Sequence, residues 1–171
     1  IKLTVANYTG AYDGKYHNIA VKASKSGTTF KYSLDNKTWT KKAPKFKDAN
    51  GTQTVYIKAE NGDAVAYAKG TVTIKPVKIT LTAGSASKTY DGTALLPTQG
   101  SAGTGTDDGY TYTQNVLVEG DVLVATVSGS QTDAGTSVSK VTSYKVVRYG
   151  EDEDGNTTET DVTSFYTFAD S

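Results

Sequence analysis

Along most of the chain, apolar residues take every second position over short stretches, and clusters of polar residues and Gly separate these stretches. A period of two is that of a β-strand with one buried face. No stretch of helical length has the period of an amphipathic helix. The pattern therefore predicts an all-β protein built from short strands. The expected strands cover residues 1–5, 30–34, 54–59, 70–75, 77–82, 110–118, 122–127, 138–149 and 162–168, with an acidic loop at 150–160.

A repeated tripeptide divides the chain. Tyr12-Asp13-Gly14 recurs as Tyr90-Asp91-Gly92, a shift of 78 residues, and each copy follows an alternating strand. Asp can accept a hydrogen bond from the backbone that follows it, and Gly adopts positive φ without a steric penalty. Both tripeptides are therefore expected to form tight structural turns rather than ligand contacts, with each Tyr ring lying at the edge of a core.

Charge changes sign at Pro76. Residues 1–76 hold 13 Lys against 5 acidic residues, a net charge of +8, whereas residues 77–171 hold 5 basic against 13 acidic residues, a net charge of −8. Together with the repeat, this predicts a basic module at 1–76 and an acidic module at 77–171. Short strands separated by turns at this spacing are typical of immunoglobulin-like β-sandwiches.

The end of the second module differs from that of the first. Residues 70–74 close the first module with the alternating sequence Gly-Thr-Val-Thr-Ile, and the second has no counterpart. We therefore expect the second module to lack its last strand. Because the sequence also begins without Met or a signal peptide, we expect it to be a piece of a longer protein.

Few residue types that support catalysis are present. The chain has no Cys, which excludes disulfides and thiol nucleophiles, and its single His17 cannot form a histidine metal cluster. No set of nucleophile, base and orienting group is visible, so we expect no enzyme activity. No apolar run is long enough for a membrane helix. The Lys residues are spread out rather than clustered as in nucleic-acid binders, so neither nucleic acid nor membrane insertion is expected.

Two groups of residues are candidates for binding. The aromatic residues Trp39, Tyr56 and Tyr67, or the pair Tyr110 and Tyr112, could form a platform for a glycan. The favoured alternative places Trp39 in the core and pairs the Tyr residues on strand faces.

The acidic loop offers the second candidate. Asp152, Asp154 and Asn156 could supply oxygen ligands to Ca²⁺. The spacing lacks the closing Glu of a calcium loop, so a solvated acidic loop is the favoured interpretation. No other cofactor is expected.

The motifs resemble a known family. In the first module these are residues 12–17, Trp39 and Pro44; in the second they are residues 88–95, 119–121 and 161–163. Over nearly its whole length the chain resembles the tandem Tyr-Asp-Gly-type (MBG/Ig-like) repeats of cell-surface and adhesin proteins of Gram-positive bacteria. The departure from that pattern is the absent last strand.

That resemblance implies an extracellular, cell-wall-associated stalk whose partners are neighbouring modules of the same protein. Two alternatives stay open: an adhesin that binds a glycan or host protein through exposed aromatic residues, and an accessory module of an enzyme. A fold family alone cannot choose among them.

Overall fold

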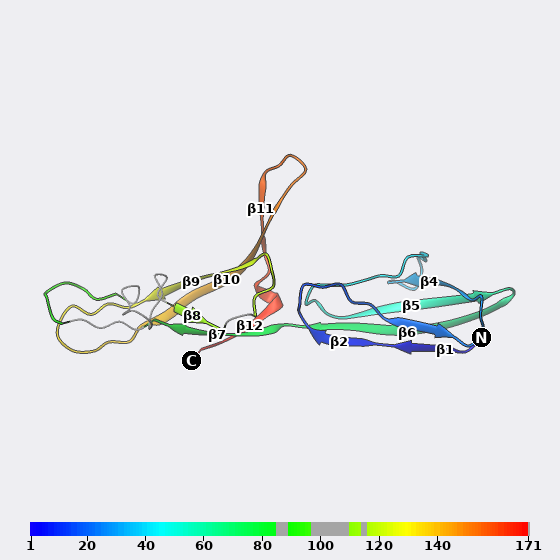
Figure 1. Ribbon diagram of the computed structural model, residues 1–171, viewed down its shortest axis with the longest axis horizontal. Helices are drawn as coiled ribbons and strands as arrows, with labels where there is room; N and C mark the ends of the chain where they lie inside the picture. Colours follow the sequence, from blue (N-terminus) through cyan, green and yellow to red (C-terminus); the bar gives the residue numbers. More distant parts are fainter. Residues whose placement is uncertain (85–88, 97–109, 114–115, 171) are drawn as a thin grey trace. The chain divides into compact units, whose positions relative to one another are not determined.

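Strands make up the architecture of both halves of the chain (Figure 1). The structure is a computed structural model that describes residues 1–84, 89–96, 110–113 and 116–170. Apart from the short 3₁₀ helix η2 (Thr163–Phe165), the described residues contain no helix. The chain is therefore all-β, as the pattern predicts. It divides into two units, Ile1–Pro76 and Val77–Ser171, at the position where the charge changes sign.

Unit 1 contains two sheets. Its strands are β1 (Leu3–Ala6), β2 (Tyr8–Ala11), β3 (Ala20–Ala23), β4 (Thr29–Ser33), β5 (Gly51–Asn61) and β6 (Ala64–Lys75). One sheet is the antiparallel pair β1-β3, and the other has the order β2-β6-β5-β4. In the second sheet β2 runs parallel to β6, and the remaining pairs are antiparallel.

The start of the chain passes from one sheet of unit 1 to the other. A single strand was expected at residues 1–5. The structure has two strands here, β1 and β2, with Asn7 between them. The side-chain Oδ1 of Asn7 accepts a hydrogen bond from the backbone N–H of Thr71 at 2.9 Å. At the neighbouring Gly70, an added Cβ would lie 2.7 Å from Val5 Cγ1 and 2.9 Å from Ile19 Cγ2. Gly70 thus allows β6 to approach β1 and the segment before β3 closely.

The core of unit 1 follows the alternation of its two longest strands. Val55, Ile57 and Ala59 of β5 are fully buried, as are Val72 and Ile74 of β6. The residues between them point to the outer face of the sheet, because successive side chains of a strand alternate. The strand expected at 54–59 is therefore correct but short, since polar and small residues extend both strands beyond their apolar centres.

Unit 2 also contains two sheets. Its strands are β7 (Val77–Ala83), β8 (Tyr110–Tyr112), β9 (Asp121–Ser128), β10 (Lys140–Glu151), β11 (Thr157–Asp161) and β12 (Tyr166–Asp170). The sheet orders are β12-β7-β8 and β11-β10-β9, and β12 runs parallel to β7. Contacts between β10 and β7 join the two sheets. Buried residues of both sheets, among them Ile79, Leu81 and Val146, form the core.

Several boundaries in unit 2 differ from expectation. The strand expected at 110–118 ends at Tyr112 among the described residues, and Gln114 and Asn115 lie outside them. The loop expected at 150–160 is largely a hairpin, in which β10 continues to Glu151 and β11 begins at Thr157 (Figure 1). All five residues of β11 are exposed, so no apolar alternation marked it as a strand.

The last part of unit 2 also needs correction. The strand expected at 162–168 begins with η2 and becomes a strand only at Tyr166. In contrast, the strand expected at 138–149 is present as β10, with a bulge between Val141 and Ser143. β12 pairs in parallel with β7 as β6 does with β2, so a last strand is present among the described residues.

Candidate functional site

Both Tyr-Asp-Gly tripeptides form the same backbone turn. Gly14 has φ 73° and Gly92 has φ 79°, the left-handed region that favours Gly. The Asp13 carboxylate accepts a hydrogen bond from the N–H of Lys15 at 2.9 Å, and the Asp91 carboxylate accepts one from the N–H of Thr93 at the same distance. The repeat in the sequence is therefore a repeat of turn geometry.

The two tyrosines of the repeat differ in environment. Tyr12 is 3% exposed, and its N–H donates to the carbonyl oxygen of Lys75 at 2.9 Å, at the end of β6. Tyr90 is 64% exposed and belongs to no strand. The expectation that each Tyr lies at a core edge is thus wrong for Tyr90, and within the described residues no backbone hydrogen bond like that of Tyr12 ties it to a strand.

His17 holds the first of these turns in place. Its Nε2 lies 2.9 and 3.0 Å from the two carboxylate oxygens of Asp13, and its ring stacks on Tyr8 with centroids 4.0 Å apart. Its backbone exchanges two hydrogen bonds with Phe46. Burial raises the pKa of Asp13, but the hydrogen bonds from His17 and from the backbone of Lys15 outweigh it, so the net pKa is lowered.

The His17–Asp13 pair does not resemble a catalytic dyad. Within the described part of the chain, the side chains bonded to His17 are Asp13 and Tyr8. No hydrogen bond from a Ser or Thr hydroxyl to this ring occurs among the described residues, whereas a hydrolase of this type requires such a nucleophile. The pair therefore fastens the turn to β2 and to the segment around Phe46.

An aromatic hollow lies on the outer face of the four-stranded sheet of unit 1. Tyr56 of β5 is paired across the strands with Lys69 of β6, two residues from Tyr67, which is 66% exposed. The ring of Trp39, from the loop after β4, lies 6.2 Å from that of Tyr67 at an angle of 60°. The hollow has a volume of about 360 Å³. It is lined by Asn36, Trp39, Tyr56, Ile57, Tyr67, Ala68 and Lys69.

The loop that carries Trp39 is fixed on both sides. Before it, the Asp35 carboxylate accepts hydrogen bonds from the Ser33 hydroxyl and from the N–H groups of Lys37 and Thr38, at 2.9, 2.8 and 2.7 Å. The backbone hydrogen bonds from Thr38 and Lys37, followed by that from Ser33, lower the pKa of Asp35 to about 2. After Trp39, the backbones of Thr40 and Tyr32 exchange two hydrogen bonds of 2.8 Å.

The structure corrects two expectations about the aromatic residues. Trp39 does not belong to the buried core of unit 1 but is half-buried against exposed Tyr67. The Asp35 turn carries the chain onto the outer face, which the alternation of β4 alone did not reveal. Tyr110 is only 8% exposed, with its hydroxyl near the carbonyl oxygen of Leu123, and so does not offer a ligand surface. Tyr112 is half-buried beside it.

The acidic turn between β10 and β11 is held by hydrogen bonds to one of its own side chains. The Asp152 carboxylate accepts hydrogen bonds from the N–H groups of Asp154 and Asn156 at 3.0 and 2.8 Å. In the parts of the chain that the structure describes, no three His, Cys, Asp or Glu side chains are grouped as a metal site. The calcium site considered at Asp152, Asp154 and Asn156 therefore receives no geometric support.

A buried polar network in unit 2 escaped the sequence reasoning. The fully buried carboxylate of Asp121 accepts hydrogen bonds from Arg148 Nε at 2.9 Å and from the Tyr166 hydroxyl at 2.7 Å. The Tyr166 hydroxyl in turn accepts one from the N–H of Val118 at 3.0 Å. The network joins β9, β10 and β12, and thus both sheets. Asp121 lies just before the strand expected at 122–127, and no local pattern distinguishes it from the exposed acidic residues.

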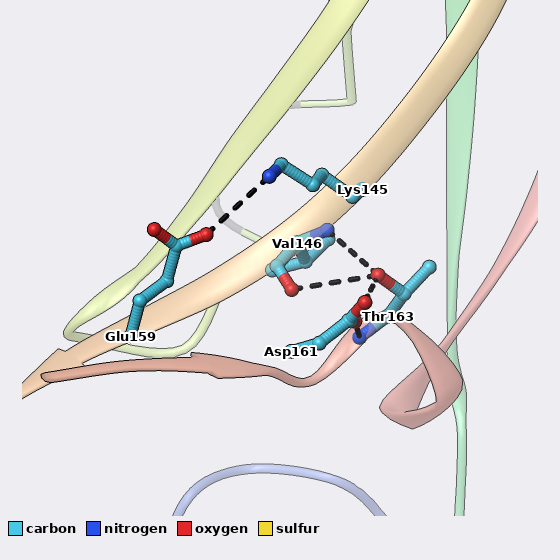
Figure 2. Close-up of polar contacts among 5 residues, drawn as sticks. All are labelled: Lys145, Val146, Glu159, Asp161 and Thr163. Carbon is cyan, nitrogen blue, oxygen red and sulfur yellow. Dashed lines mark hydrogen bonds and ion pairs between the residues drawn. The ribbon is translucent and has the colours of Figure 1, made fainter.

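A second polar corner fixes the path from β11 to β12. Figure 2 shows the Thr163 hydroxyl between the backbone of Val146 and the carboxylate of Asp161. It accepts from the Val146 N–H at 3.0 Å and donates to Asp161 at 2.6 Å. The hydrogen bonds from the Thr163 hydroxyl and backbone lower the pKa of Asp161. Nearby, Lys145 and Glu159 form an exposed ion pair of 3.3 Å. These hydrogen bonds hold the chain in place between β11 and β12.

Comparisons with known proteins identify no family. No family model matches the chain, and no curated protein matches it. A solved structure of fibronectin(III)-like modules of CbhA from Clostridium thermocellum is similar at 16% identity, with a TM-score of 0.31, over 98% of this chain and 95% of the other. At this level the likeness carries no argument about fold or function. No helix among the described residues meets the length and apolarity that a bilayer crossing requires.

Proposed function

We propose that the chain is a non-catalytic, load-bearing spacer of an exported, cell-wall-associated bacterial protein. The observation that carries this proposal is the parallel pairing of an early strand with the last strand in each unit. In unit 1 these are β2 and β6, joined over four residue pairs from Tyr8↔Val72 to Ala11↔Lys75. In unit 2 they are β7 and β12, joined over five pairs from Tyr166↔Val77 to Asp170↔Leu81.

This pairing resists tension between the ends of a unit. A pull on the two ends draws the early strand toward its N-terminal end and the last strand toward its C-terminal end. Because the strands are parallel, these directions are opposite along one shared axis, and the hydrogen bonds between the strands are loaded together in shear. An antiparallel pair pulled from one end would instead open one bond at a time. Forced unfolding depends on the unfolding barrier, so shear loading raises the force required.

Single-molecule pulling tests the proposal. The chain has no Cys, so pairs of introduced thiols give defined attachment points. One variant carries thiols at Ile1 and Ser171 and loads both parallel pairs in shear. The control carries them at Lys2 and Ser24, whose backbone N–H and hydroxyl meet at the end of the antiparallel pair β1-β3. We expect the first geometry to need a clearly higher force; equal forces in both geometries would refute the load-bearing function.

Adhesion is the second candidate, and the aromatic hollow of unit 1 favours it. An exposed Tyr67 ring held against Trp39 on an outer sheet face has no role in the core. Exposed apolar groups gathered at one place are typical of interaction sites. Spacer and adhesin are compatible, since the parallel pairs and the hollow use different residues of the unit.

A further inference from the structure

The aromatic hollow has the features of a small-molecule site. Its volume of about 360 Å³ falls near the lower end of the range of about 300 to 1,000 Å³ for such pockets, which combine aromatic walls with a few polar groups. Asn36 and Lys69 supply the polar groups here. The Asp35 hydrogen bonds and the Thr40–Tyr32 pairing fix the loop, so little ordering is needed when a ligand binds.

The aromatic geometry points to a sugar ring. A pyranose has an apolar C–H face and polar edges, which match the apolar face and polar edge of Trp and Tyr. Trp39 and Tyr67 are inclined at 60° and form a notch rather than a flat surface. A notch contacts one sugar ring on two sides, whereas a flat row of rings would suit an extended chain.

The charged residues around the hollow indicate the sign of the charge that a ligand would carry. Two lysines on the same face, Lys31 and Lys58, each pair with the Glu60 carboxylate, at 3.1 and 2.8 Å. Lys69 lines the hollow itself, and within the described part of the chain it has no carboxylate partner. The described residues that line the hollow include no acidic side chain. A ligand carboxylate would supply the missing partner.

We propose that this hollow binds one pyranose unit that carries a carboxylate, as in a uronic acid. The ring lies against Trp39 and Tyr67, the carboxylate pairs with Lys69, and the Asn36 amide bonds a hydroxyl. The inference deepens the adhesin function and is independent of the load-bearing function, which the pulling experiment tests separately. One such site binds weakly, with a Kd of about 1 mM, so useful attachment needs several copies.

Trp39 is the only Trp of the chain, so its fluorescence reports directly on the hollow. The full chain is titrated with a glucuronic-acid oligosaccharide and with a neutral glucose oligosaccharide of the same length and linkage. We expect both to change the fluorescence, with the acidic sugar bound up to about five-fold more tightly, the upper end for an exposed ion pair. Raising the salt concentration should reduce this preference.

Three variants locate the interaction. Lys69→Gln should keep binding of the neutral sugar and lose the preference for the acidic one. Trp39→Ala, followed by calorimetry, should lose both. Tyr16→Ala removes another exposed aromatic residue of unit 1, one that lies beside Lys45 and Lys47, and should change neither.

Each contrary result overturns a defined part of the proposal. Absence of binding of both sugars at a concentration of about 10 mM, ten-fold above the expected Kd, refutes the proposed site. Binding that survives in Trp39→Ala also overturns it. An acidic preference that persists in Lys69→Gln overturns the role of Lys69. Circular dichroism of each variant confirms that loss of binding does not reflect unfolding.

Discussion

The buried carboxylate of Asp121 is expected to be the most sensitive polar position of unit 2. Asp121→Ala removes the acceptor for Arg148 Nε and for the Tyr166 hydroxyl. The Arg148 side chain is 27% exposed, so it stays largely buried when the Asp121 carboxylate is removed. Breaking a buried ion pair by removing one partner costs about 3 to 5 kcal/mol. We take the lower end, about 3 kcal/mol, because Arg148 keeps some contact with solvent.

A cost of this size is readily measured. For a unit of this size, each kcal/mol lowers the Tm by about 4 to 8 °C, so the substitution should lower the Tm of unit 2 by at least about 12 °C. Circular dichroism follows both units, whereas the fluorescence of Trp39 reports only on unit 1. The transition seen by fluorescence should therefore stay in place while another transition in the circular dichroism moves.

Two further variants provide reference values for the loss of stability expected from Asp121→Ala. Lys145→Ala removes an ion pair whose partners are 51% and 50% exposed, and such pairs contribute about 0 to 1 kcal/mol. Tyr166→Phe removes a hydroxyl that donates to Asp121 and accepts from Val118, and should cost about 1 to 3 kcal/mol. If Asp121→Ala costs no more than Lys145→Ala, the conclusion that this network stabilises unit 2 is wrong.

Two other predictions concern unit 1. Gly70→Ala places a Cβ 2.7 Å from Val5 Cγ1, and overpacking of this kind should lower the free energy of unfolding by about 1 to 3 kcal/mol. Urea unfolding followed by Trp39 fluorescence measures this loss. An unchanged urea midpoint would show that the two sheets can separate slightly. The pKa of Asp35 is lowered from 3.8 to about 2, so its carboxylate stabilises unit 1 fully above pH 3.8, and this contribution is lost as the pH falls through 2. Between pH 5 and pH 2 the wild type should lose more stability than Asp35→Asn, and parallel pH profiles of the two would contradict the role of that carboxylate.

Period-two alternation was sufficient to predict the fold class, because most strands have one buried face. It located β5, β7 and β9 through residues such as Val55, Ile79 and Leu123, which are all buried. It failed where a strand has no buried face, as in β11, and where a strand changes sheets, as at Asn7. Both failures have one cause: burial there is decided by pairing between distant residues, which a local pattern does not contain.

The candidate site could be predicted from the sequence even less well than the fold. Trp39 and Tyr56 could be identified from the sequence as candidate binding residues. A core position was nevertheless favoured for Trp39, since large aromatic residues are usually buried. What places Trp39 on the outer face is the carboxylate of Asp35, through hydrogen bonds within the loop. What brings Tyr56 opposite Lys69 is the register of β5 and β6. Neither the loop bonds nor the register could be derived from residue types alone.

The two proposed functions of unit 1 meet on a single strand without sharing residues. The first part of β6 presents Tyr67 and Lys69 to the hollow, and its last part, Val72 to Lys75, forms the parallel pair with β2. Gly70 and Thr71 separate them, and there the strand contacts Val5 and receives the Asn7 side chain. Tension would therefore act on the parallel pair first, while the hollow is held by β5, β6 and the Asp35 loop. We expect ligand binding at Trp39 to persist up to the force at which β2 leaves β6, measured as Trp39-dependent sugar binding to a chain held under load. Loss of binding well below that force would show that the two ends of β6 are mechanically coupled.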